Sequence, residues 1–119
     1  SMFMLIDSLL NKITEWAYDR YNIQDSTPKD QFIKAVAEMG ELADAINKNN
    51  NVGIKDGIGD VIVCLNNIAY MCNTDIEDCL EVAWSSIKDR QGVMHNGVFI
   101  KSTDPQYEEI LRQKQNNPL

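Results

Sequence analysis

Apolar residues recur at three- and four-residue steps in four separate stretches of this chain, and this period limits the possible folds more than any other feature. Polar or glycine-containing breaks separate the stretches, so short links are expected between helices. Each helix needs neighbours to cover its apolar side. The predicted fold class is therefore all-α: a four-helix bundle, followed by a short extended segment and a small last helix. The four helices are expected at about 3–20, 28–47, 54–71 and from a capping box at 74–77 to residue 90.

The helix boundaries rest on particular residues. Thr27 and Pro28 suit the cap and first turn of the second helix. Residues 49–51 and Gly53 are interpreted as a turn, after which Gly57 and Gly59 allow close packing in the first turns of the third helix. The residues expected to face inward are Phe32, Val36, Met39, Ala43 and Ile46 on the second helix, and Ile58, Val61, Ile62, Leu65, Ile68 and Ala69 on the third.

The last part of the chain has a different pattern. Gly92 is expected to end the fourth helix, and residues 93–101 alternate weakly around Gly97, which predicts an extended segment or a small hairpin. Asp104 and Pro105 are placed to start a short helix through 107–111.

Composition excludes several classes of protein. With 119 residues, a single domain over 2–119 is expected, and Ser1 is interpreted as a residue left by cloning. The net charge of −7 argues against nucleic acid as a partner. No apolar run approaches the roughly 18 residues of a membrane span. The three cysteines, Cys64, Cys72 and Cys79, have no C-x-x-C spacing and predict reduced thiols in a cytoplasmic protein.

Four acidic residues form two pairs on neighbouring predicted helices. Glu38 and Glu41 are three residues apart, and Asp56 and Asp60 are four apart, so each pair shares a helical face. The link between the two helices is short, which favours antiparallel neighbours and brings the pairs together. Converging carboxylates repel one another unless a cation neutralises them, and oxygen-only ligands favour Mg²⁺, Mn²⁺ or Ca²⁺. Magnesium commonly takes its remaining ligands from substrate phosphates. The alternative reading is a solvated acidic face, with the aspartates favoured by a helix N-terminus.

Residues 38–46 (EMGELADAI) and 56–63 (DGIGDVIV) resemble the MazG-like nucleotide pyrophosphohydrolases of the all-α NTP pyrophosphatase superfamily. The family pattern is Glu-x-x-Glu followed by Glu-x-x-Asp, and residues 84–101 are similar to a phosphate-contacting tail of phage and bacterial members. The resemblance implies Mg²⁺-dependent hydrolysis of a nucleoside or deoxynucleoside triphosphate to the monophosphate and pyrophosphate, with a metal-activated water attacking the α-phosphate. It also implies a homo-oligomer, either a dimer or a tetramer.

The resemblance assigns roles to residues of this chain. Glu38, Glu41 and Asp60 become the catalytic and metal-binding acids, with Mg²⁺ as the cofactor and Mn²⁺ as a substitute. The third family acid would fall on Gly57, so Asp56 is taken as the replacement ligand, and one or two metals remain possible. Asn67 lies on the same face and either assists or makes a polar contact within the bundle. The candidate substrate-binding residues are Lys34, Lys88, Arg90, Lys101 and Trp16.

Each substrate-binding candidate also has a structural interpretation. Lys88 and Arg90 suit a helix C-terminus, Lys34 a surface ion pair, and Trp16 a core position. The single His95 supports no nucleophilic triad. Two further functions stay open: a catalytically weak or inactive nucleotide- or metal-binding protein of the same fold, and a structural helical interaction module.

Overall fold

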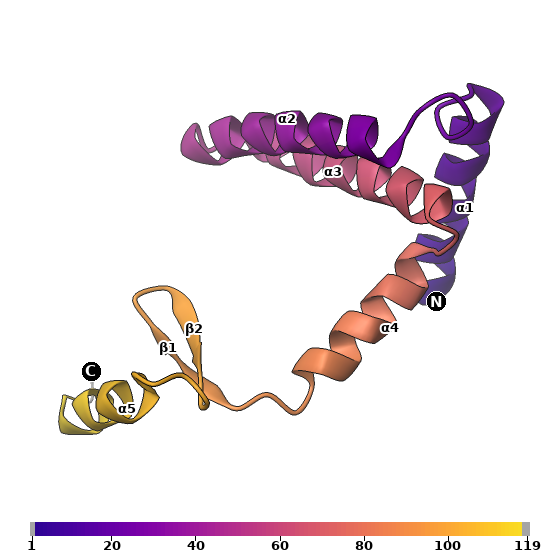
Figure 1. Ribbon diagram of the computed structural model, residues 1–119. Helices are drawn as coiled ribbons and strands as arrows, with labels where there is room; N and C mark the ends of the chain where they lie inside the picture. Colours follow the sequence, from indigo (N-terminus) through magenta and orange to yellow (C-terminus); the bar gives the residue numbers. More distant parts are fainter. Residues whose placement is uncertain (1, 118–119) are drawn as a thin grey trace. The chain divides into compact units, whose positions relative to one another are not determined.

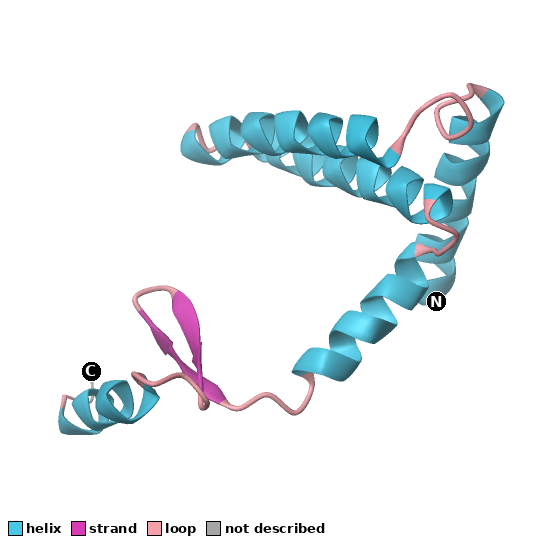
Figure 2. Ribbon diagram, viewed as in Figure 1, coloured by secondary structure: helices cyan, strands magenta, loops and turns pink. Residues whose placement is uncertain are grey.

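The computed structural model describes residues 2–117 and confirms the all-α class (Figures 1 and 2). The chain consists of two compact units, the first ending at Cys79 and the second beginning at Leu80. Within the described range the elements are α1 (Met2–Asp19), α2 (Pro28–Asn47), α3 (Asn51–Met71), α4 (Ile76–Ile87), β1 (Gly92–His95), β2 (Val98–Lys101) and α5 (Tyr107–Asn116).

The first unit is built on the antiparallel pair of α2 and α3, with α1 packed against α3 (Figure 1). The side chain of Thr27 accepts a hydrogen bond from the backbone N–H of Asp30 at 3.2 Å, which caps α2 as predicted. The side chain of Asn50 accepts one from the N–H of Gly53 at 3.1 Å and caps α3. Because Asn50 is the cap, α3 begins three residues earlier than the predicted start at 54.

Two boundaries of α4 also differ from the prediction. The side chain of Asp75, and not that of Thr74, accepts a hydrogen bond from the N–H of Asp78 at 2.8 Å. The helix therefore begins at Ile76, and it ends at Ile87 instead of Arg90. The amide of Arg90 already bonds to the carbonyl of Ile87 in a tight turn, which takes the chain out of helical conformation before β1.

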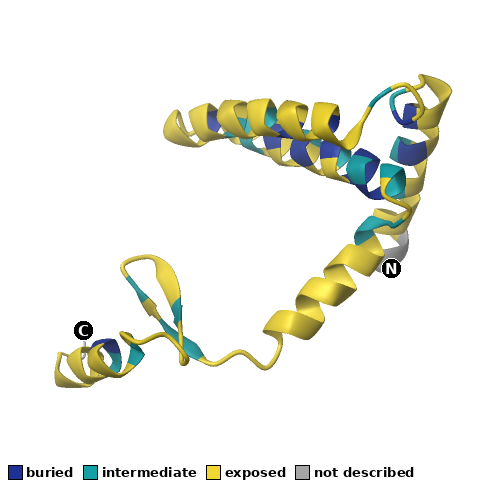
Figure 3. Ribbon diagram, in the orientation of Figure 1, coloured by how far each residue is buried: buried dark blue, intermediate teal, exposed yellow. Residues whose placement is uncertain are grey.

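Buried residues lie along the contact between α2 and α3 (Figure 3), and the apolar ones among them are small. Ala35 and Ala45 of α2 and Val61, Cys64 and Ala69 of α3 are buried. Small side chains let the two helices approach closely, so the larger apolar residues lie outside the contact. Among the residues predicted to face inward, Val61 and Ala69 are buried, as expected. The prediction was wrong for the following residues, which are exposed: Phe32, Val36, Met39, Ala43, Ile46, Ile58, Ile62 and Leu65.

The second unit contains the hairpin predicted at 93–101. Asn96 and Gly97 both have positive φ, 49° and 80°, and form the two-residue turn between β1 and β2. Gly92 faces Phe99, whose ring would clash with any side chain at that position. Ile110 of α5 is buried, and α5 packs against β1. The last helix begins at Tyr107, because residues 104–106 form a turn in which Asp104 accepts from the N–H of Gln106.

Two glycines of α3 provide a direct test of this packing. A Cβ on Gly57 would lie 3.1 Å from the Cβ of Leu42, whereas one on Gly59 would meet nothing within 4 Å. Replacement by alanine gains about 1 kcal/mol of helix propensity at both positions, but overpacking against Leu42 costs about 1–3 kcal/mol at Gly57 alone. Urea denaturation should therefore show Gly59→Ala to be more stable than Gly57→Ala by about 1–3 kcal/mol. Equal changes at the two positions would contradict the α2–α3 contact.

Candidate functional site

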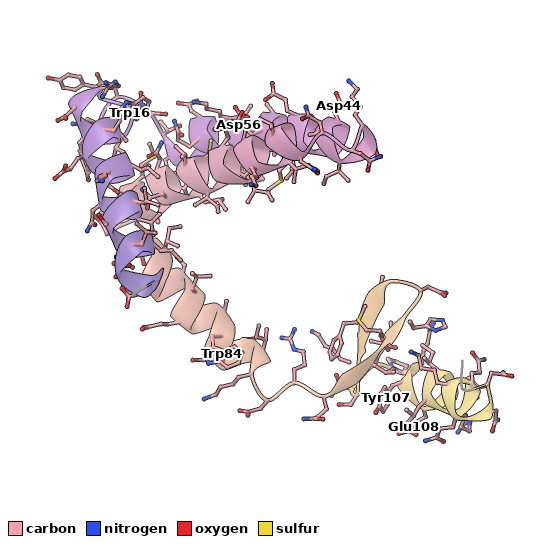
Figure 4. All side chains as sticks on the ribbon, turned by 180° about the vertical axis from the view of Figure 1, so that it is seen from behind. Trp16, Asp44, Asp56, Trp84, Tyr107 and Glu108 are labelled. Carbon is pink, nitrogen blue, oxygen red and sulfur yellow. The ribbon has the colours of Figure 1, made fainter. Side chains whose placement is uncertain are left out.

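The four predicted acids line two hollows in the first unit. Glu38 and Asp60 line a cavity of about 510 Å³, and Glu41, Asp56 and Asp60 line a second hollow of about 240 Å³. Asp60 borders both. The antiparallel pairing of α2 with α3 thus places the four acids around two adjoining hollows. Figure 4 shows Asp56 and Asp44 on the α2–α3 pair and Trp16 on α1.

Glu38 has an environment that favours its neutral form. A hydrogen bond with the Glu41 carboxyl raises the pKa of Glu38, and burial and the charges of Glu41 and Asp60 raise it further, while Lys34 lowers it. Its Oε2 atom is buried and has no hydrogen-bond partner. Because this pKa is raised, the contribution of Glu38 to stability is present at low pH and is lost as pH rises through that pKa. A cation beside Glu38 would reverse this loss, since it favours the charged carboxylate.

The acids have the chemistry of a magnesium site, since all their donor atoms are carboxylate oxygens and one of them is buried without a partner. Over residues 2–117, however, no three or more His, Cys, Asp or Glu side chains are gathered closely enough to hold a metal ion. Metal binding by Glu38, Glu41, Asp56 and Asp60 therefore remains a prediction. Their arrangement around two adjoining hollows is what the structure establishes.

Lys34 and Trp16 line the larger cavity together with Glu38 and Asp60. Trp16 is 46% exposed, so it is not the core residue that its place in an amphipathic helix also allowed. The guanidinium of Arg20 lies 4.6 Å from the centroid of the Trp16 ring, a cation–π contact that holds the ring. Lys34 and Trp16 are thus placed beside the acids, and their contact with a substrate stays a prediction.

A buried amide chain forms another wall of this cavity. Asn67 is 3% exposed, and its Nδ2 donates to Oε1 of Gln31 at 3.1 Å. Gln31 in turn donates through Nε2 to Oγ of Ser26 at 3.2 Å. The polar contact predicted for Asn67 is therefore confirmed. Beside it, burial raises the pKa of the Cys64 thiol, which keeps that thiol protonated.

Sequence reasoning missed several residues of these hollows. Lys12 and Asn22 reach the larger cavity from α1 and the following loop, where no periodic pattern marks them. Asp44 and Lys48 line the smaller hollow. The spacing of Asp44, three residues after Glu41, was the available signal, because residues three apart share a helical face.

The remaining basic candidates lie in the second unit. Lys88 and Arg90 follow the end of α4, where Arg90 donates to Oγ of Ser86 at 3.4 Å, and Lys101 is the last residue of β2. Their contact with phosphate stays a prediction. His95 lies 3.3 Å through Nε2 from Nδ2 of its neighbour Asn96, a local contact at the hairpin turn.

Two general findings bear on the setting of the site. No helix in the described part of the chain is both long and apolar enough to span a membrane. The three cysteines are free.

Comparison with known proteins gives one family match. A family model described as the MazG nucleotide pyrophosphohydrolase domain matches residues 27–93, more than half of the chain. A protein of Haemophilus phage HP1 (strain HP1c1), described as an uncharacterized 18.2 kDa protein in the rep-hol intergenic region, is 45% identical over 60 residues. That alignment covers 50% of this chain but only 37% of the phage protein. No solved structure matches significantly.

Proposed function

Because this chain belongs to the MazG nucleotide pyrophosphohydrolase family, we propose that it hydrolyses a nucleoside or deoxynucleoside triphosphate to the monophosphate and pyrophosphate, using Mg²⁺. The observation that carries this proposal is the position of Glu38, Glu41 and Asp60 around the two adjoining hollows. Glu38 shares a hydrogen bond with Glu41, is affected by the charge of Asp60, and keeps a buried oxygen without a partner. A cation bound there would satisfy that oxygen and reduce the repulsion among the three carboxylates.

In the proposed reaction, water attacks the α-phosphorus, the bond from that phosphorus to the bridging oxygen breaks, and pyrophosphate leaves. Magnesium, when bound, neutralises phosphate oxygens and lowers the pKa of a coordinated water. Glu38, Glu41 and Asp60 are proposed to hold it, with Asp56 as a further ligand from the smaller hollow. Lys34 lines the same cavity as Glu38 and supplies a positive charge towards the phosphates.

We place the activity in one domain over residues 2–119, because the family match at 27–93 crosses the division between the two units. Lys88, Arg90 and Lys101 are proposed as additional phosphate contacts. The free cysteines favour a reducing compartment, and we assign the protein to the cytoplasm.

A second candidate function follows from Gly57. The family acid expected there would place its Cβ 3.1 Å from the Cβ of Leu42, so Leu42 would have to move to admit the side chain. A protein with one acid fewer would bind a magnesium–nucleotide complex and turn it over weakly or not at all. Product analysis distinguishes this binding protein from the enzyme.

The test is hydrolysis of a panel of standard and modified triphosphates with Mg²⁺. We expect equal amounts of monophosphate and pyrophosphate, with no reaction once the metal is chelated. Release of orthophosphate would show that the reaction is misassigned. A shift of the melting temperature with Mg²⁺ and nucleotide, but without products, would support the binding protein. No shift at all would leave only a structural helical module.

A further inference from the structure

The larger cavity contains two buried polar atoms that have no hydrogen-bond partner. Over residues 2–117, the buried side-chain oxygen and nitrogen atoms without a hydrogen-bond partner are Oε2 of Glu38 and Oδ1 of Asn67, and both residues line this cavity. A buried acceptor without a partner is costly and is uncommon in folded proteins. A ligand with a hydrogen-bond donor at each of these positions would satisfy both atoms.

The spacing of these atoms suits two ends of one nucleotide. Asp60 and Asn67 are seven residues apart on α3, about 10 Å along a helix, and Cys64 lies between them on the cavity wall. This separation is comparable with the reach from a phosphate across the sugar to the base. Trp16 lines the same cavity and provides the aromatic surface that a base ring contacts well.

The hydrogen bonds of the amide chain assign a different role to each polar atom of the Asn67 side chain. Its Nδ2 is held by Oε1 of Gln31, whose own Nε2 is held by Oγ of Ser26. In this arrangement Oδ1 of Asn67 has no partner and is a free hydrogen-bond acceptor. An acceptor in this position selects a ligand group that carries an N–H.

We propose that Oδ1 of Asn67 accepts a hydrogen bond from the exocyclic amino group of the base, so that the site prefers cytosine or adenine over uracil or hypoxanthine. This inference rests on the proposed function. In the keto bases a carbonyl oxygen replaces the amino group and would face Oδ1 as a second acceptor. The N3–H of uracil lies between two carbonyl oxygens that need donors of their own, and the amide nitrogen beside Oδ1 is already held by Gln31. Gln31 acts as the positioning residue.

The test compares matched nucleotides that differ at this group and at the adjacent ring nitrogen, which carries a hydrogen only in the keto base. Dissociation constants would be measured with Mg²⁺ for non-hydrolysable α,β-imido analogues of dCTP and dUTP, and for α,β-methylene analogues of ATP and ITP. Wild-type protein should bind the amino member of each pair about 10-fold or more tightly, since a site built for a hydrogen bond rejects the analogue that lacks it. Equal affinity within a pair, or preference for the keto member, would overturn the inference.

Two variants connect the preference to Asn67. Asn67→Leu removes the acceptor at similar size and should bring both ratios close to one. Asn67→Asp keeps an acceptor, and its added charge repels the triphosphate of both pair members equally, so the preference should persist. A preference that survives Asn67→Leu would show that another group reads the base. If Asn67→Leu does not fold, Asn67→Ala, which also has no side-chain acceptor, replaces it with the same expectation.

Failure of the inference can be distinguished from failure of the proposed function. If every analogue binds with Mg²⁺ but without base preference, the inference alone is wrong. If none of the four binds, the proposed nucleotide site is wrong, and the inference falls with it.

Discussion

Asp60→Asn and Glu41→Gln should each lower kcat/KM for triphosphate hydrolysis by about 100-fold or more, while the protein keeps its helical circular-dichroism spectrum. Asp60 borders both hollows, and Glu41 shares a hydrogen bond with Glu38. Each substitution keeps the size of the side chain and removes one negative charge from the cluster. The loss should therefore appear as weaker Mg²⁺ affinity and slower turnover, measured by pyrophosphate release across a metal titration.

A matched control for these variants is Asp30→Asn on the first turn of α2. It makes the same change of charge on the same pair of helices, but Asp30 is exposed and lies two turns before Glu38. It should lose only a favourable interaction with the helix N-terminus, worth less than about 1 kcal/mol, and keep its turnover. Turnover within a few-fold of wild type in both Asp60→Asn and Glu41→Gln would exclude the proposed site.

The sequence was sufficient for the location of the acids because that location depends on local rules. Residues three and four apart share a helical face, and the short link before Asn51 makes α2 and α3 antiparallel. These two facts bring Glu38 and Glu41 close to Asp60 without knowledge of any other contact. The displaced acid at Asp56 follows from the same rules, and it does line the hollow with Glu41 and Asp60.

The periodicity could not show which apolar residues are buried within one chain. Phe32 and Ile62 fit a helical stripe, and a stripe has the same sequence pattern whether it faces another part of the same chain or open space. Ala35 and Ala45 are what α2 places in the contact instead. Small residues contribute little to a hydrophobic pattern, so the sequence pattern did not predict the contact between α2 and α3 that they form.

The role of Asn67 likewise depended on the three-dimensional contacts. Its spacing from Asp60 placed it on the right face, but no sequence pattern predicts that Gln31 accepts a hydrogen bond from its Nδ2. That bond leaves Oδ1 as the amide atom without a partner. The base preference proposed above was therefore accessible only from the structure.

The exposed apolar stripes of α2 and α3 support the proposed homo-oligomer. Val36 and Met39 on α2 and Ile58, Ile62 and Leu65 on α3 recur at helical spacing and are each at least 40% exposed. At the end where α2 begins, Phe32 and Ile33 adjoin Ile68 of α3 around a hollow of about 410 Å³, so the stripes of the two helices meet. A contiguous apolar surface of this kind usually marks an interface, and a second copy of the chain offers a matching one.

Ile62→Asp should separate the oligomer into monomers, because it places an unpaired carboxylate inside the interface. Such a charge costs at least about 3 kcal/mol, which weakens association more than 100-fold. Sedimentation velocity over a range of protein concentrations measures the mass, and the melting temperature should fall with it, since association stabilises the folded chain. Val52→Asp is the matched control: it makes the same type of change in the first turn of α3, at a residue 81% exposed and outside the stripe. If Ile62→Asp retains the mass of the wild-type protein, this face is not the interface; if Val52→Asp also dissociates, the effect comes from added charge and not from the stripe.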